Sequence, residues 1–308
     1  MSFHNLKSLA DLHMSFPTEE SCILFLEGER WHGNVTSPFD PSSTVWKCKG
    51  NKYRCKNTGK YFNVRTNTFL DSSNISLRKW FFAIWLVTSH KKGISSLQLG
   101  RDIGVTQKTA WMMAHKIRTN LVSNDESKLS GTVEADESFV GGKNKNRHKD
   151  KKVVASQGRS FKDKIPVLGL LERDGRLRAF VIKDTKASSI QPIIFRNVEQ
   201  KSRFLSDEWW AYRKLDRFFM HNVVDHSKKE YVNKDDSSLH TNTIEGFWGI
   251  LKRGYNGIYN WWSKKHIQKY VDEFVFRYNT KKLKDSERFY AFFSNFVSKT
   301  PYKKLVAL

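Results

Sequence analysis

One segment restricts the fold more than any other. Residues 164–184, KIPVLGLLERDGRLRAFVIKD, carry two apolar runs on either side of Asp174 and Gly175. An Asp-Gly pair between such runs is a strong signal for a β-hairpin, because both residues tolerate tight-turn backbone angles. Further strand-like runs lie at 131–142, 202–212 and 221–227. Strands first, and then strands mixed with helices, predict a mixed α/β domain, which we expect over residues 130–285.

The first part of the chain follows a different pattern. Leu6, Leu9, Leu12 and Phe16 recur at helical spacing. This spacing predicts a helical lead over residues 1–30. A strand-and-turn module, a helical domain and a C-terminal tail are expected at 31–72, 73–125 and 286–308.

The helical domain carries the pattern of a helix-turn-helix. The segment SSLQLGRDIGVTQKTAWMMAHKIRTN reads as two helices around a tight turn at Gly104 and Val105. Thr106 can cap the second helix, as Ser76 can cap the apolar helix before this pair. We expect the second helix to expose side chains suited to phosphates and base edges: Gln107, Lys108, His115, Lys116 and Arg118. An ordinary helical hairpin with a solvated basic face is the alternative.

The strand-and-turn module has the layout of a zinc ribbon, two knuckles joined by short strands, without its ligands. A closed zinc site of this kind needs two CxxC pairs. The first pair of positions holds Ser37 and Asp40. The second pair holds Cys55 and Thr58, and Cys48 lies off the pattern. We therefore predict no structural zinc.

The charge balance restricts the partner. The chain has 54 Lys and Arg against 31 Asp and Glu, a net charge of +23. A chain this basic usually binds a polyanion, so nucleic acid is expected, with an anionic membrane surface as the alternative. No apolar run approaches the ~18 residues of a spanning helix. Three cysteines without a secretory signal suit a reducing compartment, so we expect a cytoplasmic, nucleoid-associated protein without membrane contact.

Three acidic residues stand outside the charged surface contexts of the others. Asp136 lies inside a strand-like run, Asp207 at a strand end and Glu245 near a helix start. Acids are disfavoured within strands, and like charges brought together at one sheet edge need a cation. Oxygen-only ligands suit Mg²⁺ or Mn²⁺. Two such ions, bound by these three acids, could support phosphodiester cleavage.

The stretch HTNTIEGFWGILKRG, residues 240–254, leaves two readings open. Asn242 followed by Glu245 fits a capping box, in which the acid merely caps a helix. Phe247, Ile250 and Leu251 would then face inward, and Glu245, Trp248 and Lys252 would share the other face. In the functional reading Glu245 binds metal and Lys252 holds a phosphate.

The chain resembles the DDE-type transposases of bacterial insertion sequences related to the eukaryotic Merlin transposons. The resemblance lies in RKWFFAIWLVTSHKKGISSLQLGRDIGVTQKTAWMMAHKIR, VEADESFVGGK, DEWWAY, HTNTIEGFWGILKRG and KHIQKYVDEFVFRYN, which occur in family order across roughly residues 35–305. It implies a ribonuclease-H-like catalytic domain preceded by a zinc ribbon and a helix-turn-helix. It also implies Mg²⁺-dependent transposition of double-stranded DNA, acting on terminal repeats and target DNA as a homodimer or higher oligomer.

Matched motif by motif, the resemblance implies an acidic triad of Asp136, Asp207 and Glu245. Asn242 is a rival or supporting residue for the third position, because some relatives carry Asn there. Glu137 is a weaker rival for the first position.

The basic residues after the third acid, Lys252 and Arg253, are expected to bind DNA. The chain departs from the family at the ribbon, where Ser37, Asp40 and Thr58 stand at ligand positions. An aromatic core could hold that module without metal: Trp46, Tyr53, Tyr61 and Phe62.

Three functions remain open on sequence grounds. The first is an active transposase that cuts element ends and joins the freed 3′-hydroxyl to target DNA. The second is a catalytically silent DNA-binding protein of transposase descent, which the ligand-poor ribbon favours and the complete acidic triad opposes. The third is a nuclease without strand transfer, which would use the same metal site.

Overall fold

The computed structural model describes residues 6–122, 125–142, 148–153, 164–224, 239–294 and 301–306. The chain divides into two compact units. Unit 1 joins Met1–Ser123 to Lys282–Leu308, and unit 2 is Asn124–Lys281. Most of the α/β domain expected at 130–285 lies in unit 2, and its residues 282–285 lie in unit 1.

Unit 2 is built on a five-stranded mixed sheet. Its strands are β4 (Thr132–Val140), β5 (Ile165–Glu172), β6 (Leu177–Val181), β7 (Arg203–Ser206) and β8 (Met220–Val223). The spatial order is β6-β5-β4-β7-β8. β4, β5 and β6 pair antiparallel, and β7 pairs parallel with both β4 and β8. The predicted mixed α/β fold is confirmed for this unit.

The predicted hairpin is the β5–β6 connection. Leu171 pairs with Leu177 across it. Asp174 takes a left-handed φ of 56°, which Asp accepts more readily than most residues. The backbone N–H of Gly175 donates to the carbonyl of Glu172 at 3.0 Å. Turn chemistry therefore sets the register of β5 against the edge strand β6.

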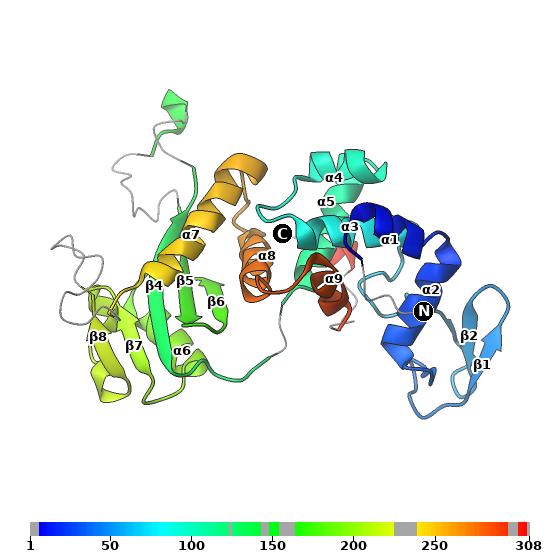
Figure 1. The fold of residues 1–308 in the computed structure, drawn as a ribbon, viewed down its shortest axis with the longest axis horizontal. Helices are drawn as coiled ribbons and strands as arrows, with labels where there is room; N and C mark the ends of the chain where they lie inside the picture. The colour runs from blue at the N-terminus through cyan, green and yellow to red at the C-terminus, as the bar shows by residue number, and fades with distance from the viewer. Residues whose placement is uncertain are drawn as a thin grey trace. The chain divides into compact units, whose positions relative to one another are not determined.

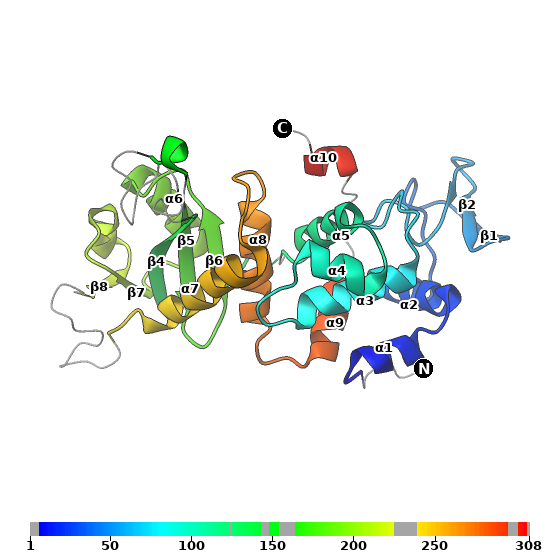
Figure 2. The same ribbon diagram turned by 90° about the horizontal axis from the view of Figure 1, so that it is seen from above.

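Helices cover both faces of this sheet, and Figure 2 shows the sheet between α7 and α6. They are α6 (Ala187–Asn197), α7 (Asn242–Gly254) and α8 (Ile267–Asn279). α7 runs across β4 and β5 (Figure 1). On the α7 side, Val167 and Leu171 of β5 pack with Phe247 and Leu251. On the α6 side, the strand residues whose side chains point to the opposite face pack with Ile190 and Ile194. Because successive side chains of a strand point to opposite faces of the sheet, the strands contribute to two separate cores.

Unit 1 is mainly helical. Its helices are α1 (Leu9–Ser15), α2 (Glu19–Trp31), α3 (Leu77–Ser89), α4 (Ser96–Ile103), α5 (Gln107–Thr119), α9 (Asp285–Phe293) and α10 (Tyr302–Val306). The predicted caps are confirmed, since the side chains of Ser76 and Thr106 accept from the first turns of α3 and α5.

An aromatic cluster joins the two ends of the chain inside unit 1. Phe16, Phe25 and Phe81 come from its first part, and Phe289 and Phe293 come from α9. All five are at least 94% buried. The segment expected as a C-terminal tail therefore contributes a helix to this core.

The strand-and-turn module is a three-stranded antiparallel sheet, made of β1 (Val45–Cys48), β2 (Lys52–Cys55) and β3 (Tyr61–Phe62). One face packs Tyr53 and Phe62 against Trp31, with ring centroids 5.3 and 6.1 Å away. Trp46 and Tyr61 lie on the other face and are 47% and 59% exposed. The prediction that all four aromatic residues form a core is wrong for these two, because strand alternation turns them to solvent.

Among the helices in the described parts of the chain, none combines the length and apolarity needed to cross a bilayer.

Candidate active site and nucleic-acid interface

Asp136 lies in the middle of β4, directly opposite Gly169 of β5. A Cβ added to Gly169 would lie 2.7 Å from Cζ2 of Trp248 in α7, so the missing side chain lets the indole reach the sheet. The Trp248 Nε1–H donates to Oδ2 of Asp136 at 3.0 Å. Strand, glycine and helix together orient this carboxylate.

Asp207 follows the last residue of β7 and comes level with Asp136. The two strands are parallel, and Glu134 pairs with Leu205. Asp136 and Asp207 each lie two residues beyond this pair, so the two aspartates reach the same edge of the sheet. Oδ1 of Asp207 accepts from the backbone N–H of Trp209 at 3.0 Å, which fixes the side chain as the strand ends.

Glu137 joins the two aspartates. Carboxylate oxygens of Asp136, Glu137 and Asp207 all lie within 4.8 Å of one another, and each side chain is half-buried. The Tyr212 hydroxyl donates to Oε1 of Glu137 at 2.6 Å. Burial, followed by the charge of Glu137, raises the pKa of Tyr212 well above its usual range. Tyr212 therefore remains a proton donor that holds Glu137 in place.

The electrostatics of this group favour a cation. Burial raises the pKa of Asp136 to about 7, and the charges of Asp207 and Glu245 add to the effect. The Glu137 N–H and the Trp248 indole oppose it by donating to the carboxylate. Carboxylates crowded in a partly buried site repel one another until a positive charge is bound.

Glu245 lies on an exposed stripe of α7. The helix buries Ile244, Phe247, Trp248 and Leu251, while Glu245 and Lys252 are exposed. The predicted faces are wrong at two positions, because Trp248 packs on the sheet and Ile250 is 37% exposed. Glu245 is near enough to raise the pKa of Asp136, but it does not belong to the three-carboxylate group.

The start of α7 is capped by a residue that the sequence reading missed. The predicted capping box is wrong, because the N-cap is Thr241 and its side chain makes no capping hydrogen bond. Instead, Oε2 of the fully buried Glu134 accepts from the backbone N–H of Ile244 at 3.0 Å. Glu245 is therefore not used as a cap.

Arg173 completes this buried link. Its Nε donates to Oε1 of Glu134 at 2.8 Å, and its Nη2 donates to the carbonyl of His240 at 2.7 Å. One residue thus ties β4 to the segment that enters α7. The signal in the sequence is VEADES, where Glu134 shares a strand face with Asp136.

The donor set fits a hard divalent cation. The three grouped residues offer only carboxylate oxygens, which Mg²⁺ and Mn²⁺ prefer. Asp136 and Asp207 are held by hydrogen bonds from Trp248 and Trp209, so these ligands are already oriented. Asp136, Asp207 and Glu137 would hold such an ion, with Glu245 beside them.

The family model of the ISXO2-like transposase domain matches residues 128–279, nearly the whole of unit 2. Unit 2 is therefore similar to the ISXO2-like transposase domain. Over 279 residues the chain is 28% identical to an uncharacterized protein in transposable element ISH50 of Halobacterium salinarum, covering 85% of this chain and 92% of that protein. The predicted kinship with insertion-sequence transposases is therefore confirmed.

Two solved structures of Mos1 are also similar. The Mos1 strand transfer complex matches with 14% identity and a TM-score of 0.28, covering 72% of this chain and 79% of that one. A pre-cleavage Mos1 transpososome matches with 10% identity and a TM-score of 0.27, covering 95% of this chain and 97% of that one.

The basic residues predicted to contact DNA in the transposase domain lie at the last turn of α7. Lys252 and Arg253 are both exposed. Lys252 follows Glu245 by two helical turns on the same stripe. Asn242, the predicted rival for the third acid, is exposed at the first residue of the helix.

Among the residues expected to face DNA from unit 1, the structure separates two groups. α4 and α5 are joined by a turn in which Gly104 has a φ of 63°. Gln107 and Lys108 are exposed at the start of α5. Lys116 and Arg118 are only 5% and 2% exposed, so their predicted exposure is wrong.

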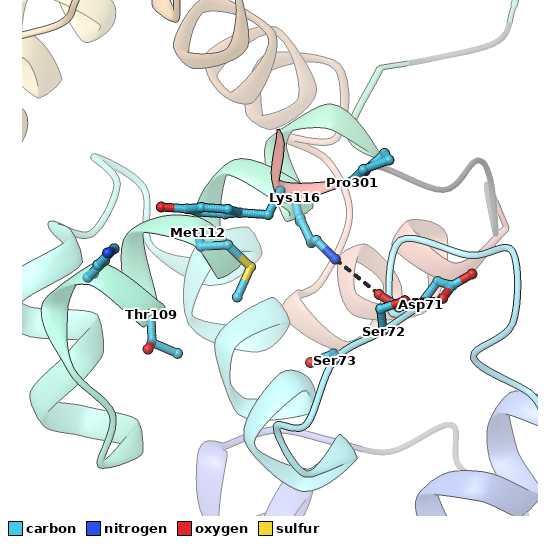
Figure 3. Close-up of a pocket in the computed structure, with 9 residues that line it drawn as sticks. Asp71, Ser72, Ser73, Thr109, Met112, Lys116 and Pro301 are labelled. Carbon is cyan, nitrogen blue, oxygen red and sulfur yellow. Dashed lines mark hydrogen bonds between the residues drawn. The ribbon is translucent and has the colours of Figure 1, made fainter. Parts of the chain in front are cut away.

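The burial of Lys116 has a specific cause. Its Nζ donates to the carbonyl of Phe69 at 2.9 Å and to that of Asp71 at 3.4 Å, as Figure 3 shows for Asp71. The cation thereby holds the loop before α3, and Lys116 and Asp71 both line a pocket of about 320 Å³. His115 is fully buried as well. The second half of α5 is packed against its own unit rather than presented to a partner.

The ribbon positions do not fit zinc, because Cys55 is the single thiol at the four expected ligand positions. Hydrogen bonds occupy the knuckles instead. Oγ of Ser37 accepts from the backbone N–H groups of Phe39 and Asp40 at 3.2 and 3.4 Å. The Asp40 carboxylate accepts from Nδ2 of Asn57 at 2.7 Å, which links the first knuckle to the second.

Cys55 lies inside this polar cluster. Its burial raises the thiol pKa, but hydrogen bonds from Ser37, Ser43 and Thr58 outweigh that effect and lower the pKa to about 6. Oγ of Ser43 also accepts from the backbone N–H of Asn57 at 3.0 Å. Hydroxyl groups of Ser37, Ser43 and Thr58 thus surround the sulfur.

Proposed function

We propose that this protein is a metal-dependent DNA transposase that cuts phosphodiester bonds at element ends and joins the freed 3′-hydroxyl to target DNA. The observation that carries the proposal is the convergence of Asp136 and Asp207 at one edge of the sheet of a transposase-family domain. The strand order and the helices on both faces support a ribonuclease-H-like fold for this domain.

The cofactor in this proposal is Mg²⁺ or Mn²⁺, with two ions for the complete reaction. Bound at the carboxylates, such ions activate an attacking oxygen and stabilise the leaving one. The half-buried position of the three carboxylates supports this role, because a less solvated site strengthens their hold on a cation.

The chain's own residues have distinct tasks in this proposal. Asp136 and Asp207 are metal ligands, and Glu245 is the third acid by its motif. Glu137 is a further ligand candidate, because the buried Tyr212 holds it beside the aspartates. Lys252 and Arg253 bind the phosphates of the DNA strand near the acids, as their exposure on α7 allows.

Unit 1 supplies DNA recognition in this proposal. Gln107 and Lys108 lie exposed at the start of the second helix of a helix-turn-helix, the end that usually meets base edges. Lys116 and Arg118 no longer belong to the proposed interface, since both are buried. Assembly on terminal repeats as a dimer or higher oligomer remains part of the proposal.

The test is a cleavage and strand-transfer assay on double-stranded DNA that carries the repeats flanking the coding region. It compares Mg²⁺ with EDTA, and the unaltered chain with Asp207→Asn. Asp216→Asn is a matched control, because Asp216 is an exposed aspartate of the same unit. We expect metal-dependent joining that Asp207→Asn abolishes and Asp216→Asn preserves.

Other outcomes would select the competing functions. Tight DNA binding with no cleavage in Mg²⁺ or Mn²⁺ would make the protein a DNA-binding relative without catalysis. Cleavage that never produces joined ends would make it a nuclease. Cleavage unaffected by Asp207→Asn would overturn the assignment of the site.

A further inference from the structure

The exposed face of the β1–β2–β3 sheet carries a row of three large side chains. Trp46 pairs directly with Arg54, and Arg54 pairs directly with Tyr61. The row therefore crosses all three strands at one level. Two aromatic side chains about half exposed are costly in water, so a surface that displays them in register suits a partner that covers them.

Arg54 organises this row. Its guanidinium carbon lies 5.9 Å from the ring centroid of Trp46 and 5.7 Å from that of Tyr61. The cation attracts both rings and keeps them ordered on either side of it. Ordered rings lose less conformational entropy when a flat ligand stacks on them.

The charge around the row identifies the partner as a polyanion. Residues 41–70 contain seven Lys and Arg and no Asp or Glu. Six of these cations are exposed. Lys47 pairs with Tyr53 on the opposite face, which leaves five on or beside the row: Lys49, Lys52, Arg54, Lys56 and Lys60. A basic surface with ordered aromatic side chains combines phosphate binding with stacking, the two contributions that hold single-stranded nucleic acid.

We propose that this sheet face binds unpaired DNA, with one base stacked on Trp46 and another on Tyr61. The two rings stand two strands apart, roughly 10 Å, so each takes its own base while Arg54 and the neighbouring lysines bind phosphates. A paired base has both faces covered by its neighbours in the duplex, whereas an unpaired base can leave the stack for an aromatic ring. The inference rests on the proposed function only in taking DNA as the nucleic acid.

The experiment measures binding of the full-length protein to a short dye-labelled oligothymidylate and to a duplex of the same length, by fluorescence anisotropy in EDTA. The variants are Trp46→Ala, Tyr61→Ala and both together. Trp46→Phe and Tyr61→Phe keep a ring at each position. Phe218→Ala is the control, because Phe218 is 45% exposed and lies in the other unit.

We expect each alanine variant to weaken binding of the single strand by about tenfold or more, with little change for the duplex. The phenylalanine variants and the control should bind as the unaltered protein does. Equal losses for single strand and duplex, or none for either, would overturn the proposal. So would losses that merely follow a fall in the melting temperature, since cross-strand pairs also stabilise sheets.

The design separates this proposal from the proposed function. Row-dependent binding of the single strand by a protein that never cuts DNA would uphold the surface and refute the transposase. Cutting and joining of DNA, with single-strand binding unaffected by substitutions in the row, would uphold the transposase and refute the binding surface. A loss of self-association in the alanine variants, with single-strand binding intact, would identify the face as a protein interface and overturn the proposal.

Discussion

The carboxylate of Glu134 accepts a hydrogen bond from the backbone N–H of Ile244 across 3.0 Å, and so joins the strand of the first acid to the helix of the third. Glu134 precedes Asp136 by two residues on β4, and Ile244 precedes Glu245 by one on α7. The same carboxylate is paired with Arg173. The separation of Asp136 and Glu245 therefore depends on a residue that needs no contact with DNA or metal.

Glu134→Gln should loosen this connection. The variant loses the negative charge that Arg173 and the start of α7 both use. Because Arg173 is 20% exposed and Glu134 is fully buried, we expect a loss of about 1–3 kcal/mol in the free energy of unfolding. Urea denaturation followed by circular dichroism measures it. Glu199→Gln, at an exposed position, should change nothing, and equal stability of the two variants would contradict the connection.

Gly169→Ala should push α7 away from the sheet. The added Cβ would lie 2.7 Å from Trp248 and 2.8 Å from Ile244, both buried. Overpacking of this kind costs about 1–3 kcal/mol. Gly246→Ala, on α7 itself, is the control. A Cβ at that position meets nothing within 4 Å, so the substitution should raise helix stability slightly. Thermal melts of both variants test the pair, and a stabilised Gly169→Ala would refute the packing.

Glu137→Gln and Glu245→Gln should separate metal binding from turnover. In the absence of DNA, Glu137 lies with the two aspartates and Glu245 does not. We expect Glu137→Gln to weaken binding of Mn²⁺ by about tenfold or more, measured by isothermal titration calorimetry. Glu245→Gln should bind Mn²⁺ nearly as before but fail to cut DNA. Equal losses of affinity in the two variants would place Glu245 in the resting ligand set instead.

A chelator should leave the ribbon-like module unchanged. Its knuckles are joined by the Asp40–Asn57 hydrogen bond rather than by thiolates around a metal. Without added Mg²⁺ or Mn²⁺, so that the acidic cluster of unit 2 holds no added ion, we expect the same melting temperature with and without EDTA, and a lower one for Asn57→Ala, read by differential scanning calorimetry. Asn34→Ala, at an exposed position without a role in the knuckles, is the control. Melting that EDTA lowers would show that metal holds the module after all.

Local signals made several elements predictable. The turn at Asp174 and Gly175, and the caps Ser76 and Thr106, depend on neighbours within a few residues, so the sequence contains the whole explanation. The approach of Asp136 to Asp207 was also expected. It requires only that acids on two parallel strands reach the same edge of a sheet.

Contacts between distant residues were not predictable in this way. Glu134 looks like one more acid of VEADES, and its partners Arg173 and Ile244 lie 39 and 110 residues away. Lys116 looks like a solvated cation, but it satisfies carbonyl groups of a loop 45 and 47 residues earlier. In each case the helix or strand itself was predicted correctly, but contacts with a distant segment decided whether the side chain is buried.

The contribution of α9 to the aromatic cluster has a consequence for the order of synthesis. The ribosome completes every strand and helix of unit 2 before it reaches Phe289 and Phe293. Domains fold as units while the chain emerges, so the acidic cluster can assemble while the core of unit 1 still lacks two of its five rings. A nascent chain would then hold its carboxylates in place before the helices proposed to read DNA are locked together.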